Sequence, residues 1–74
     1  MDEKILEIMR SVFGTQDVTT QSSQTNCDKW DSLRHLNLIV ELEDAFELEF
    51  EPEEIAEMKS FDVVKACLEK KLSE

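Results

Sequence analysis

The sequence predicts an all-α protein, a small helical bundle of three main helices and one short helix, with a long loop between the first and second helices. Two observations predict this fold class. Apolar residues recur at spacings of three and four over several stretches, and residues 31–47 are mostly strong helix formers without Gly or Pro. A chain of 74 residues forms one domain with a small core, because domains this short bury only about 60% of their unfolded surface.

The first helix is expected over Asp2–Phe13. Apolar residues recur there at helical spacing, namely Ile5, Ile8, Met9 and Val12, with Leu6 and Phe13 alongside. Gly14 is expected to end this helix in the left-handed conformation, which glycine adopts without steric cost.

The stretch Thr15–Lys29 has no helical period and is rich in Thr, Gln and Ser. We expect a long loop there. Connections of more than about 12 residues are uncommon in compact domains and are usually functional or fixed to the core. Val18 and Trp30 are the side chains expected to fix it.

A second helix is expected to begin at Asp31 or Ser32, which are both favourable N-cap residues, and to run to about Glu47. A helical projection separates two apolar surfaces on it. The wider one should face the core and comprises Leu38, Ile39, Leu42, Ala45 and Phe46. The other comprises Leu33, Leu36 and Val40 and is bordered by acids, among them Glu43, Asp44 and Glu47. An apolar patch with a charged rim indicates a protein-binding surface, and the alternative is a wide core face that buries all three.

The remaining chain should form a loop, a short helix and a last helix. Leu48 and Phe50 alternate with acids, but a lone strand would have no partner, so we expect a loop. Pro52 is suited to the first position of the short helix, from which Ile55 and Met58 should point inward. Ser60 should cap the last helix, whose buried face is expected to comprise Phe61, Val64, Leu68 and Leu72.

The charge of the chain restricts its partners. Eighteen acidic and eight basic residues give a formal net charge of -10, which repels nucleic acid and anionic lipid and attracts proteins with basic patches. No segment has the length or apolarity of a membrane span or a signal peptide, so we expect a cytoplasmic monomer without membrane insertion. Cys27 and Cys67 are not spaced like a metal or redox pair, and no EF-hand loop occurs; we expect neither a structural disulfide nor a specific metal site.

The segment from Trp30 to Phe46 reads WDSLRHLNLIVELEDAF and resembles the signature of the acyl carrier protein family. The length, the acidity and the order of the expected helices resemble that family along the whole of residues 1–74. The resemblance implies that Ser32, within the Asp31-Ser32-Leu33 motif, receives a 4'-phosphopantetheine group from coenzyme A through a phosphopantetheinyl transferase. It further implies a carrier of thioester-bound acyl groups in fatty acid, lipid or specialised acyl-group biosynthesis, and not an enzyme.

The resemblance also gives the apolar flank of the second helix a role. Enzymes that load or transfer acyl groups would dock there through basic surfaces, on Leu33, Leu36 and Val40. Glu43, Asp44 and Glu47 would steer them. Ile39, Leu42, Phe46, Ile55 and Phe61 would either line a space for an acyl chain or fill the core.

Several alternatives stay open. Ser32 could simply cap the helix of an acidic protein-interaction module that has no prosthetic group. Aminoacyl and peptidyl carriers share the serine and the fold. Ser32 and His35 lie three residues apart, but no nucleophile elbow accompanies them, so we expect His35 to be half-buried and not catalytic. Arg34 and Asn37 stand where carriers of fatty acid synthesis usually have acids, and Trp30 replaces a small residue, which indicates a specialised carrier.

Overall fold

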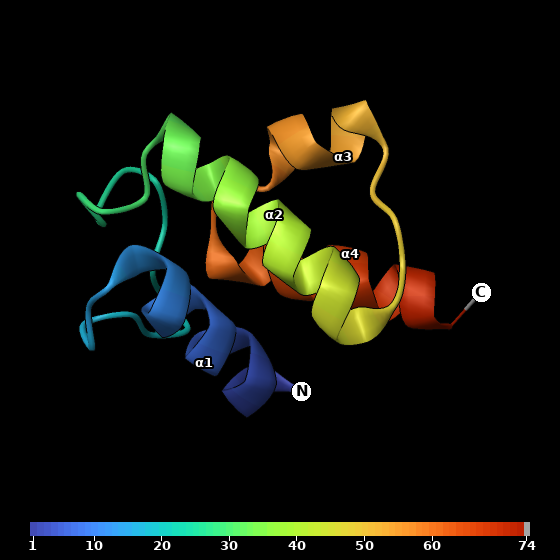
Figure 1. The fold of residues 1–74 in the computed structure, drawn as a ribbon, viewed down its shortest axis with the longest axis horizontal. Coiled ribbons are helices and arrows are strands. Elements are labelled where there is room, and N and C mark those ends of the chain that lie inside the picture. Colours follow the sequence, from blue (N-terminus) through green and yellow to red (C-terminus); the bar gives the residue numbers. More distant parts are fainter. Residues whose placement is uncertain (74) are drawn as a thin grey trace.

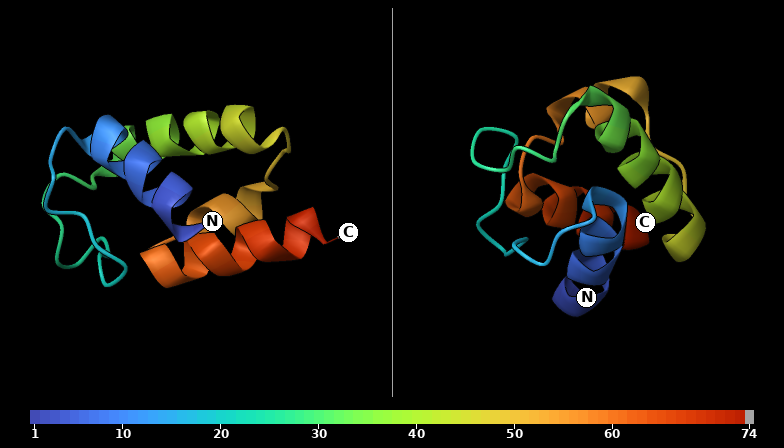
Figure 2. Two further views of the ribbon diagram at one scale, coloured as in Figure 1. Left: turned by 90° about the horizontal axis from the view of Figure 1, so that it is seen from below. Right: turned by 60° about the vertical axis from the view of Figure 1, so that its left-hand side comes forward.

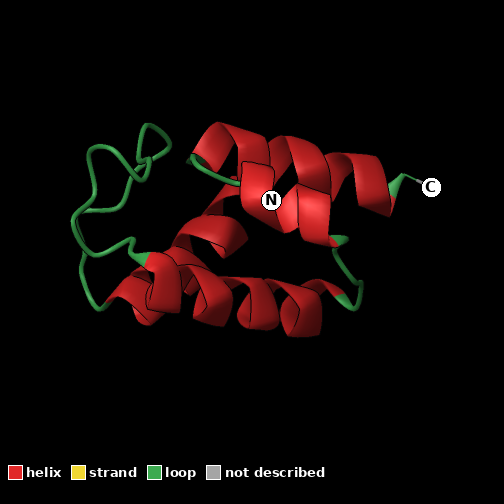
Figure 3. Ribbon diagram, turned by 90° about the horizontal axis from the view of Figure 1, so that it is seen from above, coloured by secondary structure: helices red, strands yellow, loops and turns green. Residues whose placement is uncertain are grey.

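The computed structural model describes residues 1–73 and contains four helices in this range (Figure 1). They are α1 (Asp2–Phe13), α2 (Ser32–Phe46), α3 (Pro52–Glu57) and α4 (Phe61–Leu72). No strand occurs within residues 1–73, so the predicted bundle of three main helices and one short helix is confirmed. α2 and α4 lie on opposite sides of the molecule (Figure 2), and the long loop lies at one end of the bundle (Figure 3).

Apolar side chains from the helices and the connections between them form one core. The buried members are Ile5, Leu6, Met9, Phe13, Val18, Trp30, Leu38, Ile39, Leu42, Phe50, Met58, Phe61, Val64 and Leu68. On α1 the buried stripe is rotated from the one we expected, because Leu6 and Phe13 belong to its centre while Ile8 and Val12 lie at its margin. Each large side chain that is fully buried contributes about 1.5–3 kcal/mol of transfer free energy.

Two residues in the left-handed conformation end the helices α1 and α2. Gly14 follows α1 with φ of 66°, as expected, and its N–H donates to the carbonyl of Arg10. Glu47 follows α2 with φ of 54°, and its N–H donates to the carbonyl of Glu43. A side chain with a Cβ is strained in this conformation, so Glu47 occupies a position that suits glycine better.

The long loop is fixed to the core by the two side chains that the sequence indicated. Val18 and Trp30 are both buried, and the Trp30 ring packs against the ring of Phe13 with centroids 5.3 Å apart. The guanidinium of Arg10 donates to the carbonyl of Val18 at 3.1 Å, which ties the first part of the loop to α1.

Backbone hydrogen bonds also tie the middle of the loop to the start of α4. The N–H of Phe61 donates to the carbonyl of Ser22, and the N–H of Gln24 donates to the carbonyl of Lys59, both at 2.9 Å. These bonds form an isolated bridge between Ser23 and Ser60. The loop is therefore held at its middle as well as at both ends.

The last turn of α4 packs differently from our expectation, which was wrong for Leu72. Leu72 is 46% exposed, because this turn extends past the neighbouring helices (Figure 2). The adjacent Lys71 makes the contact with the bundle instead: its ammonium pairs with Glu54 at 2.9 Å and lies 5.9 Å from the centre of the Phe50 ring.

The carboxylate of Glu54 joins α3 to α4. It accepts the N–H of Glu51 at 2.7 Å at the start of α3, besides pairing with Lys71. Both interactions lower the pKa of Glu54 below its ordinary value, and the hydrogen bond from the backbone of Glu51 has the larger effect. α3, which is only six residues long, thus depends on a contact with α4 to stay in place.

The left-handed positions generate a prediction about stability. Glu47→Gly should raise the free energy of unfolding by about 0.5–1 kcal/mol, because relief of the strain at Cβ exceeds the entropy cost of a glycine. Gly14→Ala should lower the free energy of unfolding by about 1 kcal/mol for the converse reason. Urea denaturation followed by circular dichroism measures both.

Glu47→Ala is the matched control, because it removes the same charge and keeps the Cβ. If Glu47→Ala stabilised the chain as much as Glu47→Gly, charge repulsion would be the cause and the conformational argument would fail.

Candidate functional site

Ser32 is the first residue of α2, and the residue before it caps the helix. The Asp31 side chain accepts the N–H of Arg34 at 2.9 Å, which is the N-cap hydrogen bond. Ser32 is exposed, and its hydroxyl makes no hydrogen bond to any other group in residues 1–73. The alternative in which Ser32 serves as the helix cap is therefore wrong.

Asp31 is held in place by Arg34 through two contacts. Besides the backbone bond to one carboxylate oxygen, the Arg34 guanidinium donates to the other oxygen at 2.9 Å. Both groups remain partly exposed, so the pair contributes little to stability, about 0–1 kcal/mol. Its main effect is to offset the negative charge of Asp31 beside Ser32.

A buried hydrogen-bond relay through His35 fixes the first turns of α2. The indole N–H of Trp30 donates to Nδ1 of His35 at 2.9 Å, and Nε2 of His35 lies 2.8 Å from the carbonyl oxygen of Ile55. Since indole is only a donor, Nδ1 must be the acceptor, and Nε2 carries the hydrogen that is donated to Ile55. The relay therefore joins the end of the long loop, α2 and α3.

The relay also corrects our expectation for His35. This residue is 9% exposed and belongs to the buried group, not to a half-buried margin. Both ring nitrogens are occupied, one by Trp30 and the other by Ile55. The imidazole is therefore not placed to accept a proton from Ser32.

Three large apolar side chains of α2 face solvent, as the helical projection indicated. Leu33, Leu36 and Val40 are 69%, 57% and 60% exposed, and we call them the α2 apolar face. The alternative, in which a wide core face buries all three, is wrong. Contiguous exposed apolar groups are costly to solubility and commonly mark a site of protein association.

The acids expected around this face differ in their environment. Asp44 and Glu47 are exposed, in the last turn of α2 and just after it. Glu43 is half-buried, and its carboxylate accepts the N–H of Phe50 at 2.9 Å. Glu43 therefore holds the α2–α3 connection against the helix, a structural role that the sequence did not indicate.

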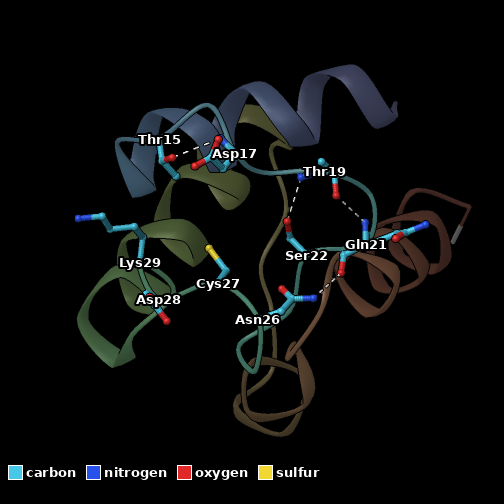
Figure 4. A pocket seen from close by; sticks show the side chains of 9 residues that line it. All are labelled: Thr15, Asp17, Thr19, Gln21, Ser22, Asn26, Cys27, Asp28 and Lys29. Carbon is cyan, nitrogen blue, oxygen red and sulfur yellow. Dashed lines mark hydrogen bonds between the residues drawn. The ribbon is translucent and has the colours of Figure 1, made fainter.

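The long loop encloses a polar cavity of about 440 Å³ that the sequence did not indicate (Figure 4). Its hydroxyl and amide side chains mostly bond to the loop's own backbone, as Thr15 does to the N–H of Asp17 and Ser22 to the N–H of Thr19. The lining residues are Thr15, Asp17, Thr19, Gln21, Ser22, Asn26, Cys27, Asp28 and Lys29.

A second cavity, of about 330 Å³, lies on the surface between α3 and α4. Cys67 is one of its lining residues, and burial together with the neighbouring carboxylate of Glu54 raises the pKa of the thiol. A thiol with a raised pKa is a poor nucleophile. Neither this cavity nor the first is lined by the five residues considered for an acyl chain, Ile39, Leu42, Phe46, Ile55 and Phe61.

Cys27 and Cys67 are free thiols. Within residues 1–73, no three potential ligand side chains are grouped so that they could hold a metal ion. No helix in the same range is long and apolar enough to cross a bilayer. No protein-family model matches the chain, and a search of curated proteins found no match.

The capping geometry predicts different effects for two adjacent substitutions. Asp31→Ala should lower the free energy of unfolding by about 1 kcal/mol, because it removes the N-cap acceptor of α2. Ser32→Ala should change the free energy of unfolding by less than about 0.5 kcal/mol, since its hydroxyl has no hydrogen-bond partner in the described part of the chain. Urea denaturation checks both, and Asp31→Asn, which retains a capping oxygen, is the control. Equal losses for Asp31→Ala and Ser32→Ala would contradict this assignment.

The relay predicts a larger effect in the core. His35→Phe should lower the free energy of unfolding by about 2–4 kcal/mol, because the Trp30 N–H and the Ile55 carbonyl lose their buried partner. His35→Gln keeps an acceptor and a donor on one side chain, so it should lower the free energy of unfolding by less than His35→Phe does. In a double-mutant cycle with Trp30→Phe, a coupling near zero would show that the bond between Trp30 and His35 contributes nothing.

Proposed function

We propose that this chain is a carrier protein, with 4'-phosphopantetheine attached to Ser32 as a phosphodiester. The observation that carries the proposal is the unused hydroxyl of Ser32 at the start of α2, exposed and free of the capping role that Asp31 fulfils. The resemblance of the segment Trp30–Phe46 to the acyl carrier signature supports the same residue.

The surroundings of Ser32 fit a phosphodiester. The N-terminal end of a helix favours an anion by about 0.3–1 kcal/mol, through the helix dipole and its unpaired N–H groups. The adjacent carboxylate of Asp31 would repel that anion, but the Arg34 guanidinium 2.9 Å away offsets its charge. Modification of Ser32 would also disrupt no hydrogen bond within residues 1–73.

The bound group would supply a terminal thiol that carries an acyl group as a thioester. This chain's own residues have to display that group and leave it unreacted. The first turn of α2 is held rigidly by the relay of Trp30 and His35, so the attachment point is defined. His35 has both nitrogens engaged, and the Cys67 thiol has a raised pKa, so neither is placed as a base or nucleophile against a thioester.

The α2 apolar face supports recognition by partner enzymes. It begins at Leu33, directly after Ser32, and a partner that covered it would come within reach of the attached group. Partners would be the phosphopantetheinyl transferase and the enzymes that load and transfer acyl groups. Asp44 and Glu47 would steer their basic surfaces and make the association rate dependent on salt.

The cargo that we propose is an acyl group, in keeping with the strong negative charge of the chain. A specialised carrier fits better than a general one, because Arg34 and Asn37 replace acids beside the α2 apolar face and Trp30 takes part in the relay. We place this carrier in the cytoplasm as a monomer.

Intact mass spectrometry tests the proposal. The purified chain is incubated with coenzyme A, Mg²⁺ and a phosphopantetheinyl transferase of broad specificity. The wild type should gain the mass of one phosphopantetheinyl group, and Ser32→Ala should gain none. Ser11→Ala, which removes an exposed serine from α1, is the control and should react like the wild type.

If several transferases fail to modify the wild type, and circular dichroism shows that the sample is folded, the carrier proposal is wrong. An interaction module that uses the α2 apolar face without a prosthetic group then becomes the better explanation.

A further inference from the structure

The charges along α2 change from one end of the helix to the other. From Asp31 to Val40 the segment holds one carboxylate and one guanidinium, which pair with each other at 2.9 Å. From Glu41 to Glu47 it holds four carboxylates and no cation. The solvent-facing side of α2 is therefore close to neutral at the Ser32 end and strongly negative at the other end.

The two ends of α2 are far enough apart to interact with separate groups of a partner. Arg34 and Asp44 are ten residues apart, which in an α-helix is about 15 Å. The Debye length at physiological ionic strength is about 8 Å, so the charge at one end is largely screened at the other. The α2 apolar face begins at Leu33, next to Arg34, and runs toward Asp44 on the same side of the helix as Asp44. Arg34 follows Leu33 directly and therefore lies about 100° around the helix from it, at the border of this face.

Contacts at each end preserve this difference. Both oxygens of Asp31 bond to Arg34, one to its N–H and one to its guanidinium, so the negative charge of Asp31 is already partly offset. The Arg34 side chain is 39% exposed, and its guanidinium has further N–H donors besides the one that bonds to Asp31. At the other end Lys4 reaches α2, but it binds the carbonyl of Ala45 on the core side and packs over the Phe46 ring.

We infer that Arg34 determines which partners dock on α2 and in which orientation. A partner would place a basic patch over Asp44 and Glu47, cover the α2 apolar face, and present a neutral or acidic group to Arg34. A partner with a basic group at the Ser32 end is disfavoured, because like charges would meet there. This inference rests on the proposed carrier function and adds to it a specificity-determining residue and an orientation.

The test compares three charge changes of two units each in the phosphopantetheinyl transfer reaction. The probe is a transferase with basic residues around its active site, supplied with coenzyme A and Mg²⁺, and the readout is kcat/KM. At low salt, Arg34→Glu should raise kcat/KM about threefold to tenfold, because it removes the repulsion at the Ser32 end. Asp44→Lys should lower kcat/KM about tenfold, and 0.5 M NaCl should reduce both effects.

Lys70→Glu is the matched control, because Lys70 is exposed on α4, on the opposite side of the molecule from α2 (Figure 2). It changes the net charge as much as Arg34→Glu does and should alter kcat/KM less than twofold. Equal effects of Arg34→Glu and Lys70→Glu, or no effect of Arg34→Glu, would overturn the inference while the carrier function stands. If the folded wild type is not modified at all, the carrier function fails and this inference falls with it.

Discussion

Three segments that are distant in the sequence meet at the imidazole of His35. The indole of Trp30 ends the long loop, His35 belongs to the first turn of α2, and the Ile55 carbonyl lies in α3. A polar side chain buried to this extent is tolerated only when its donors and acceptors are satisfied, and here each nitrogen has one partner. The position of α3 and the path of the loop into α2 both depend on this arrangement, so the setting of Ser32 does as well.

The relay matters more in this chain than it would in a larger one. Three large apolar side chains of α2 face solvent, and they contribute nothing to a core that is already small. Polar contacts at the margins of the bundle stabilise it in place of those side chains. Glu43 holds the α2–α3 connection, and Glu54 holds α3 to α4. A surface kept available for binding thus lowers the stability of the fold, and these polar contacts partly offset that loss.

The sequence predicted what depends on local pattern and position. Helical periods located the helices, and Gly14, Pro52 and Ser60 marked their ends, because these residue types have specific conformational preferences. The helical projection separated the α2 apolar face from the core face but left open whether it would be buried, and the structure shows it exposed. What a partner or a prosthetic group does there remains a prediction.

The tertiary contacts could not be predicted from the sequence pattern. Asp31 and Ser32 are equally good capping residues, and only the backbone geometry decided that Asp31 fills the role. His35 looked half-buried because its partners come from Trp30 and from a backbone carbonyl in α3, which no periodicity reveals. Leu72 fits the buried period of α4, but the bundle ends before its turn.

The backbone ties at the middle of the long loop restrict how its length could change during evolution. Ser22 and Gln24 are bonded to Phe61 and Lys59, while Val18 is buried before them and Trp30 after them. The spacers between these fixed points are only a few residues long, so an insertion in either spacer would have to bulge outward or break a tie. This loop should therefore tolerate insertions less well than surface loops usually do.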